Sequence, residues 1–229
     1  MERNTHLKIK AYPDSEMLAI DLANILADEL TEALHHQERV LFAVPGGTTP
    51  GPVFDDLCAA DIDWARVDVV LTDERWVAED HPRSNTRLLK ERLLVHRASA
   101  ARFIPLYTPA HAPEEVLADL ESMIVPELPI AVALLGMGAD MHTASLFPNA
   151  PGLREALDPH APVLVPVMPE DQPEARVTLS ARVLNGAISK HLLITGDAKR
   201  EALQEAVHLE PEDAPIKAVL DGAMVHWAA

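Results

Sequence analysis

The sequence is poor in cysteine, with Cys58 as the single example in 229 residues. One cysteine excludes an internal disulfide and a zinc site built on a pair of cysteines. Its apolar neighbours Phe54 and Leu57 favour a packed thiol over a catalytic one. A chain without disulfides fits a reducing compartment, so we expect a cytoplasmic protein.

Long apolar segments are also lacking. The longest apolar run, around residues 130–135, is far shorter than the ~18 residues that a membrane-spanning helix needs. Residues 1–10 are polar and have no apolar segment of the kind found in secretory signals. We therefore expect neither a membrane protein nor an exported one.

Positive charge is scarce, since 19 basic residues face 36 acidic ones and the formal net charge is −17. Such a field repels the phosphate backbone of DNA and RNA, so we expect no nucleic-acid partner. A small anionic ligand would need a local cluster of cationic donors to overcome the same field.

Several catalytic signatures are missing from the sequence. There is no Gly-x-Ser-x-Gly elbow for a nucleophilic serine and no His-Glu-x-x-His zinc motif. The histidines are scattered, so we expect no metal site and no cofactor. Any hydrolysis would use an activated water molecule without a covalent intermediate.

What the sequence does contain is an alternation of short apolar runs with amphipathic stretches. This pattern predicts an α/β protein, a three-layer α/β/α sandwich with a mostly parallel, Rossmann-like sheet. No segment reads as an interdomain linker, so we expect a single domain over residues 1–229. Strands are predicted at residues 7–11, 40–44, 67–72, 103–107, 130–135, 163–167, 176–179, 192–195 and 223–227. Helices are predicted at residues 14–36, 52–60, 84–95, 113–124, 197–207 and 214–220.

The first candidate site segment follows the strand at 40–44, where residues 45–50 read Pro-Gly-Gly-Thr-Thr-Pro. Glycines let backbone N–H groups approach an anion, threonines add hydroxyl donors, and the following helix start favours negative charge. A plain tight turn remains the alternative. The residues concerned are Gly46, Gly47, Thr48 and Thr49.

The second segment follows the strand at 67–72 and reads Asp-Glu-Arg-Trp-Val, with Ser-Asn further along at 84–85. Open parallel sheets place ligands beyond the carboxyl ends of their strands, which favours Asp73, Arg75 and Asn85 as site residues. The alternative is a solvated loop with a structural Asp–Arg pair.

The third segment spans residues 134–148 and is the most specific. Two glycines follow an apolar strand, and Asp140 stands two residues before His142, close enough to orient its imidazole. Two cations further along, Arg176 and Lys199, are candidates for an anion site. Lys199 opens a predicted helix, where its charge opposes the helix dipole and is better explained by a bound anion.

Taken in this order, the segments resemble the 6-phosphogluconolactonases, within a wider group that includes glucosamine-6-phosphate deaminase. The family patterns are Gly-Gly-Ser-Thr-Pro, Asp-Glu-Arg-x-Val-Pro with a later Ser-Asn, Gly-x-Gly-x-Asp-Gly-His-Thr-Ala-Ser-Leu-Phe-Pro, Arg-x-Thr and Gly-x-x-Lys. The resemblance extends over residues 40–199. Met141 stands where the family usually has glycine, and a left-handed backbone there would cost ~1 kcal/mol or more. Phe147 stands where the deaminases carry a glutamate, which favours a lactonase.

The resemblance implies hydrolysis of 6-phospho-D-glucono-1,5-lactone to 6-phospho-D-gluconate, in the oxidative branch of the pentose phosphate pathway. It further implies that His142 activates water, that Asp140 orients His142 and that Arg75 stabilises the oxyanion. Asp73 would contact sugar hydroxyls or position the water. The phosphate group would be bound by Gly46, Gly47, Thr48, Arg176 and Lys199, with Thr49 and Asn85 beside them.

Two rival interpretations stay open at this point. The chain could be a deaminase or isomerase of amino-sugar phosphates, which would release ammonia from glucosamine 6-phosphate. It could also be a non-catalytic sugar-phosphate sensor, although no helix-turn-helix or basic surface is evident in the sequence. The expected partner in every case is a small sugar phosphate, bound by a monomer or a small homo-oligomer.

Overall fold

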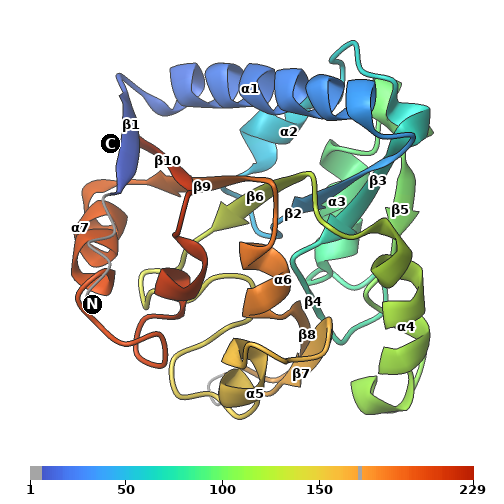
Figure 1. Cartoon of the computed structure of the whole chain (residues 1–229), viewed down its shortest axis with the longest axis vertical. Helices are drawn as coiled ribbons and strands as arrows, with labels where there is room; N and C mark the ends of the chain where they lie inside the picture. The colour runs from blue at the N-terminus through green and yellow to red at the C-terminus, as the bar shows by residue number, and fades with distance from the viewer. Residues whose placement is uncertain (1–6, 170–171) are drawn as a thin grey trace.

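A parallel seven-stranded sheet forms the centre of the protein (Figure 1). The computed structural model describes residues 7–169 and 172–229, so the first six residues of the polar start lie outside the described part. The strands lie in the order β1-β10-β9-β6-β2-β3-β5, and each neighbouring pair is parallel. Their bounds are β1 Lys8–Tyr12, β2 Val40–Val44, β3 Val67–Leu71, β5 Arg102–Ile104, β6 Val132–Gly136, β9 Ser189–Thr195 and β10 Met224–Ala228.

Helices cover both faces of this sheet. α1 (Ser15–His36) crosses one face with α2 (Gly51–Leu57) beside it, and α6 (Ala181–Asn185) and α7 (Asp197–Ala206) lie on the opposite side (Figure 1). The predicted three-layer α/β/α architecture is confirmed. The other helices are α3 Asn85–Arg92, α4 Leu117–Ile124, α5 Leu153–Leu157 and the short 3₁₀ helices η1 Trp64–Arg66, η2 His96–Ala100, η3 Pro113–Glu115, η4 Val125–Glu127 and η5 Pro215–Val219. No helix in the described ranges has the length and apolar character needed to cross a bilayer.

The long helix α1 shows how the sequence sets its own boundaries. Asp14 caps the amino end, where its carboxylate accepts a hydrogen bond of 2.8 Å from the Met17 N–H. At the other end, the Arg66 guanidinium donates to the carbonyls of Leu34 and Gln37, which the helix itself leaves without partners. Between these ends, the face toward the sheet is formed by the buried Leu18, Leu22, Leu26 and Leu30.

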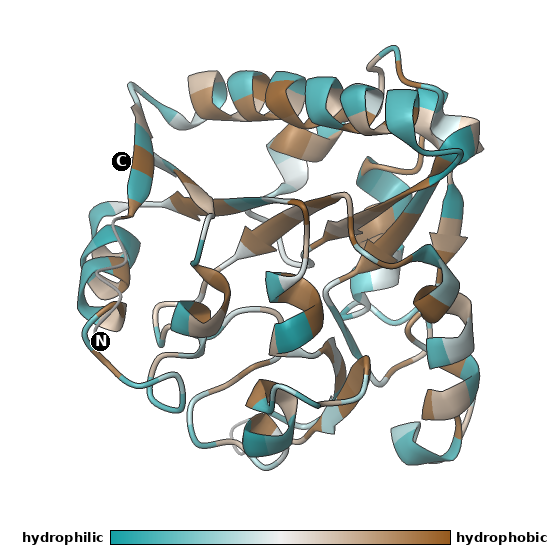
Figure 2. Ribbon diagram, in the orientation of Figure 1, coloured by the Kyte–Doolittle hydropathy of each residue, from teal (hydrophilic) through white to brown (hydrophobic). Residues whose placement is uncertain are grey.

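The central strands are buried on both faces, which explains why their sequence is apolar without alternation. All residues of β2 and β3 are buried, and these strands form part of the hydrophobic centre in Figure 2. The predicted bounds of β2 hold without change, and β3 ends one residue earlier than predicted.

A second, three-stranded antiparallel sheet is the main departure from the predicted fold. It pairs β4 (Asp73–Arg75) with β8 (Arg176–Leu179) and β8 with β7 (Leu164–Val167). The sequence predicted the last two strands but not their separation from the parallel sheet. It also assigned residues 73–75 to a loop, because three charged residues carry no apolar alternation.

The remaining differences concern short elements. The helix predicted at 113–124 is interrupted at Val116, where φ is −131°, and the one predicted at 84–95 ends as an α-helix at Arg92. The segment predicted at 214–220 forms a 3₁₀ helix, and the strand predicted at 103–107 is shorter and begins at Arg102. α5 and α6 were not predicted, because five residues are too few to show a helical period.

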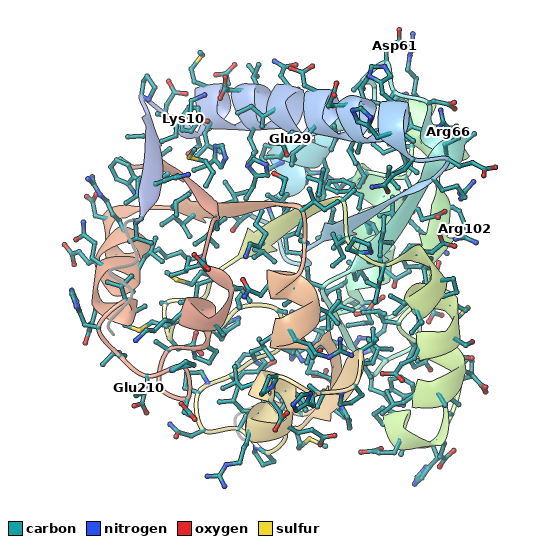
Figure 3. All side chains as sticks on the ribbon, viewed as in Figure 1. Lys10, Glu29, Asp61, Arg66, Arg102 and Glu210 are labelled. Carbon is teal, nitrogen blue, oxygen red and sulfur yellow. The ribbon has the colours of Figure 1, made fainter. Side chains whose placement is uncertain are left out.

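A charged cluster joins the amino ends of the strands, opposite the edge where ligands are expected. The buried Asp68 of β3 accepts hydrogen bonds from Arg102 at 2.7 and 2.8 Å and from Arg39 Nε at 3.0 Å. Figure 3 labels Arg102 beside β5. Burial by itself would raise the pKa of Asp68, but the hydrogen bonds from both guanidinium groups outweigh burial and lower it. This cluster therefore ties the starts of β2, β3 and β5 together.

Two histidines are buried between the sheet and α1. His226 Nε2 lies 2.9 Å from His191 Nδ1, and His226 Nδ1 lies 2.8 Å from the Tyr12 hydroxyl. This series of hydrogen bonds ends at two carboxylates of α1. His191 Nε2 lies 2.8 Å from Glu29, and the Tyr12 hydroxyl donates to Asp21 at 2.7 Å. Burial lowers the pKa of His226 from 6.5 to about 4, and the neighbouring His191 acts in the same direction. The fold therefore keeps His226 neutral at pH values where the unfolded chain is protonated.

We expect substitution of Asp68 by Asn to lower the free energy of unfolding by roughly 2 kcal/mol, measured by urea denaturation at pH 7. Removing one partner of a buried ion pair is costly, although here both guanidinium groups also reach solvent. The matched control is Asp63→Asn, which removes an exposed carboxylate 3.8 Å from Arg66 and should cost less than about 0.5 kcal/mol. Equal stability of the Asp68 variant and the wild type would contradict a role for this cluster.

The histidine pair predicts that stability falls as the pH drops from about 6.5 toward 4, the interval between the unfolded and folded pKa of His226. The unfolded chain takes up a proton there and the folded chain does not. Hydrogen bonds from Lys10 and Tyr12 lower the pKa of Asp21. Burial would raise the pKa of Glu29, but hydrogen bonds from His191 and Ser189 outweigh burial and lower it, so the contributions of both carboxylates are lost at lower pH.

Substitution of His226 by Gln should flatten the dependence of the unfolding free energy on pH within that interval. Chemical denaturation at several pH values measures the slope. The exposed His35 supplies the control, because His35→Gln should leave the slope as it is in the wild type. A His226→Gln slope as steep as that of the wild type would disprove the assignment.

Candidate active site

A cavity of about 230 Å³ lies at the carboxyl edge of the parallel sheet, where such sheets place ligands. The loops after β2 and β6 contribute to its walls, together with residues of β4, β6, β8 and β9, the start of α3 and the first turn of α7. The structure brings together at this cavity the predicted residues Gly46, Gly47, Thr49, Asp73, Arg75, Asn85, His142, Arg176 and Lys199. Thr48 and Asp140 do not line it.

The loop after β2 reaches the cavity through its glycines. Gly47 has a φ of +82°, a conformation that favours glycine, and a Cβ on Gly46 would lie 2.1 Å from Cγ of Asn85. Asn85 thus packs directly on the backbone of this loop. Thr49 lines the cavity, whereas Thr48 lines an adjoining hollow. Gly46 and Gly47, predicted to approach an anion, both line the cavity, but the structure separates the two threonines.

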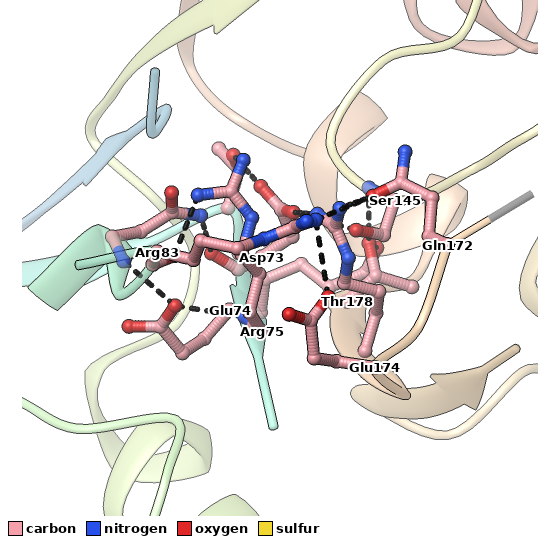
Figure 4. Close-up of polar contacts among 12 residues, drawn as sticks. Asp73, Glu74, Arg75, Arg83, Ser145, Gln172, Glu174 and Thr178 are labelled. Carbon is pink, nitrogen blue, oxygen red and sulfur yellow. Dashed lines mark hydrogen bonds and ion pairs between the residues drawn. The ribbon is translucent and has the colours of Figure 1, made fainter. Parts of the chain in front are cut away.

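The three charged side chains of β4 alternate between the two sides of the strand. Asp73 and Arg75 line the cavity, and Glu74 is fully buried on the other side of the strand (Figure 4). Glu74 accepts hydrogen bonds from the N–H groups of Arg75, Asn85 and Thr86 at 2.7, 2.8 and 2.7 Å. Burial raises the pKa of Glu74, while these donors oppose the rise. This carboxylate therefore anchors the start of α3, and Asp73 is the carboxylate that β4 presents to a ligand.

Two arginines enclose Asp73. Arg176 is 4% exposed, its Nη1 lies 3.5 Å from Asp73 Oδ2, and its Nη2 donates to Gln172. Arg75 donates from Nη1 to the carbonyl of Arg83 at 2.5 Å. The Nε atoms of both Arg75 and Arg176 are buried with no partner among the described residues. Burial lowers the pKa of Arg176, and the charge of Asp73 opposes this shift. Buried N–H groups without partners are suited to an incoming anion.

The imidazole of His142 is held by the acid that the sequence assigned to it. His142 Nδ1 lies 2.5 Å from Asp140 Oδ1, and a carboxylate can only accept, so Nδ1 carries a proton and, in the neutral imidazole, Nε2 carries the lone pair. Burial would raise the pKa of Asp140, but the hydrogen bond from His142 outweighs burial and lowers it. A Cβ on Gly138 would lie 2.2 Å from the imidazole ring, so glycine leaves the space that His142 occupies.

Met141 adopts the left-handed backbone that the sequence analysis singled out. Its φ is +66°, and its backbone accepts a hydrogen bond of 3.0 Å from the Ile216 N–H and donates one of 3.1 Å to the Gly138 carbonyl. The side chain packs against the hydrophobic core. Local contacts thus compensate for the strain, and the turn that carries His142 is formed without glycine at this position.

Phe147 belongs to the site but was not predicted as a site residue. Its ring lies 4.4 Å from the His142 ring, and the Arg176 guanidinium lies over it at 5.6 Å. The sequence analysis noted only that Phe147 replaces a glutamate of the deaminases. Its place five residues after His142 in the same motif was the available signal, but nothing in the sequence shows that its ring meets Arg176.

Lys199, in the first turn of α7, lines the cavity together with Arg75 and Arg176, and these three residues form its cationic wall. Gly196, with φ +85°, precedes that turn, and no carboxylate of the described residues pairs with the Lys199 ammonium. The cavity thus has Arg75, Arg176 and Lys199 against Asp73, a local excess of positive charge in a chain whose net charge is −17. Within the described ranges, no group of three or more His, Cys, Asp or Glu side chains is arranged to hold a metal ion. The geometry can bind an anion beside an imidazole whose lone pair is free.

Comparison with known proteins agrees with this geometry. Residues 13–227 match the family described as glucosamine-6-phosphate isomerases/6-phosphogluconolactonase. A 6-phosphogluconolactonase of Mesorhizobium japonicum is 43% identical over 227 residues, covering 95% of this chain and 94% of the relative. One from Pseudomonas aeruginosa is 42% identical, covering 90% and 88%.

Solved structures give the same result. The crystal structure of a 6-phosphogluconolactonase from Shewanella baltica superposes with a TM-score of 0.94 at 32% identity and covers all of both chains. The family match covers most of the sequence, and the identities exceed those at which only the fold is shared. This chain therefore belongs to the glucosamine-6-phosphate isomerase/6-phosphogluconolactonase family.

Proposed function

We propose that this protein hydrolyses 6-phospho-D-glucono-1,5-lactone to 6-phospho-D-gluconate, the lactonase step of the oxidative pentose phosphate pathway. The observation that carries the proposal is the His142–Asp140 pair, because His142 lines a cavity together with Arg75, Arg176 and Lys199. The names of relatives that are more than 40% identical support the same substrate.

The phosphate group binds to the cationic wall. Lys199 and Arg176 supply charge, and the backbone N–H groups of Gly46 and Gly47 supply neutral donors. The hydroxyl donor to the phosphate is Thr49 and not Thr48, because Thr49 lines the cavity and Thr48 does not. Binding a group remote from the reacting carbon holds the lactone carbonyl near the imidazole.

Water is activated by His142. Its Nε2 removes a proton as the water oxygen forms a bond to C1, and Asp140 stabilises the resulting imidazolium through Nδ1–H. The bond between C1 and the ring oxygen then breaks, and the imidazolium returns the proton to that ring oxygen. The product is the open-chain acid, which ionises in water.

Charge that develops on the carbonyl oxygen is stabilised by Arg75, whose buried Nε has no partner among the described residues. Asp73 orients sugar hydroxyls or the attacking water. These side chains together supply a base, an oxyanion donor and an anion site, so the mechanism assigns no step to a metal ion or cofactor. We further propose a single cytoplasmic domain over residues 1–229, as a monomer or a small homo-oligomer.

Substitution of His142 by Gln should lower kcat for lactone hydrolysis about 10²-fold or more, the usual effect of losing a general base. Acid release from freshly generated lactone, corrected for spontaneous hydrolysis, gives the rate. The control is His160→Gln, at an exposed histidine away from the cavity, which should leave kcat unchanged. Wild-type-like turnover by the His142 variant would remove this residue from the mechanism. Ammonia release from glucosamine 6-phosphate, without lactone hydrolysis, would instead identify a deaminase.

Substitution of Lys199 by Ala should raise KM about tenfold or more and change kcat little. In the proposed mechanism the Lys199 ammonium binds the phosphate, which does not react. Its loss therefore weakens the binding of the substrate and of the transition state equally. Steady-state kinetics on the same lactone measure both constants. Lys8→Ala, at an exposed position on β1, should leave KM unaltered. An unchanged KM in the Lys199 variant would place the phosphate elsewhere.

A further inference from the structure

Ser145 lies behind the cavity wall and connects the loop of His142 to the second sheet. Its side chain is fully buried, and its Oγ donates a hydrogen bond of 2.5 Å to Asp73 Oδ2 (Figure 4). Ser145 does not line the cavity, although its neighbour Ala144 does. The hydroxyl is therefore not placed to attack a substrate, and its hydrogen-bond partner among the described residues is a carboxylate of the site.

The backbone of Ser145 is fixed as firmly as its side chain. Its N–H donates to Thr178 Oγ1 at 3.3 Å, and this hydroxyl donates in turn to the Leu179 carbonyl at 3.1 Å. Thr178 pairs with Asp73 in the antiparallel ladder. The hydroxyl and the N–H of Ser145 thus bind Asp73 and Thr178, which lie opposite each other in β4 and β8.

These contacts set the position of the groups proposed for catalysis. Arg176 precedes Thr178 by two residues and lies on the same side of β8, and its Nη1 shares Asp73 Oδ2 with Ser145. His142 stands three residues before Ser145 in the loop after β6. One serine therefore links the loop of the imidazole to the carboxylate and the guanidinium on the other sheet.

We infer that Ser145 is a positioning residue for the lactonase reaction. By holding Asp73 Oδ2, it fixes the orientation of that carboxylate and the spacing between His142 and Arg176. This inference rests on the proposed function. Because Ser145 is fully buried, loss of its hydroxyl leaves Asp73 Oδ2 without a donor on the side that faces away from the cavity.

The test compares Ser145→Ala with two matched variants. Ser145→Ala should lower kcat about tenfold, the effect of losing one hydrogen bond to a charged group. It should change KM less than about twofold, because Lys199 and the N–H groups of Gly46 and Gly47 still bind the phosphate when Arg176 shifts. Ser145→Thr keeps the hydroxyl and should recover most of kcat. Ser180→Ala removes an equally buried serine hydroxyl that has no partner in the described part of the chain, and it should leave kcat unchanged.

A double-mutant cycle separates positioning from a general effect on folding. If Ser145 acts through Asp73, then Ser145→Ala should reduce kcat little further in an Asp73→Asn background. A purely structural role would give the same fold-loss in both backgrounds. Circular dichroism and the melting temperature establish that each variant is folded under the assay conditions.

Each outcome decides the inference. A folded Ser145→Ala variant with wild-type kcat, or full additivity with Asp73→Asn, would overturn it while leaving the proposed function intact. If Ser145→Ala does not fold, Ser145→Cys, which keeps a weak donor at similar size, should show a partial loss of kcat, and wild-type kcat would overturn the role. A wild-type protein that does not hydrolyse the lactone would remove the proposed function and this role together.

Discussion

Parallel pairing in the central sheet is the constraint on which the site depends. Because β2, β6 and β9 run in the same direction, their carboxyl ends meet at one edge, and segments far apart in the sequence come together there. The loops at 45–49 and 137–142 and the first turn of α7 are brought to the cavity in this way. Burial of β2 and β3 on both faces keeps these strands in the centre of the sheet.

The small antiparallel sheet contributes Asp73, Arg75 and Arg176 to the cavity. Its strand β8 brings Arg176 opposite Arg75 of β4, and alternation in β4 directs Asp73 and Arg75 to the cavity while Glu74 holds α3. The structure thus assigns different tasks to adjacent charged residues by strand geometry alone. Since His142 comes from the loop after β6 and Arg176 from β8, the contact between this loop and β8, made by the Ser145 N–H and Thr178 Oγ1, helps to set the distance between imidazole and guanidinium.

The sequence predicted best where a physical signal is local and repeated. β2 was predicted with its observed bounds because a buried parallel strand is a continuous apolar run, and the Asp140–His142 contact was predicted because its residues are two apart. β4 was missed because its side chains are sorted by pairing with β8, a partner about one hundred residues away. Phe147 and the separation of Thr48 from the cavity depend on tertiary packing in the same way.

The charge of the cavity is opposite in sign to the net charge of the chain. A net charge of −17 would repel a sugar phosphate at long range, but salt at physiological concentration screens exposed charges beyond about 8 Å. Inside that distance, an anion that enters the cavity would meet Lys199 and the guanidinium groups of Arg75 and Arg176, whose Nε atoms lack partners in the described structure. Affinity is therefore determined within the cavity. The acidic surface can keep the protein soluble without preventing the binding of an anion, because the two fields act over different ranges.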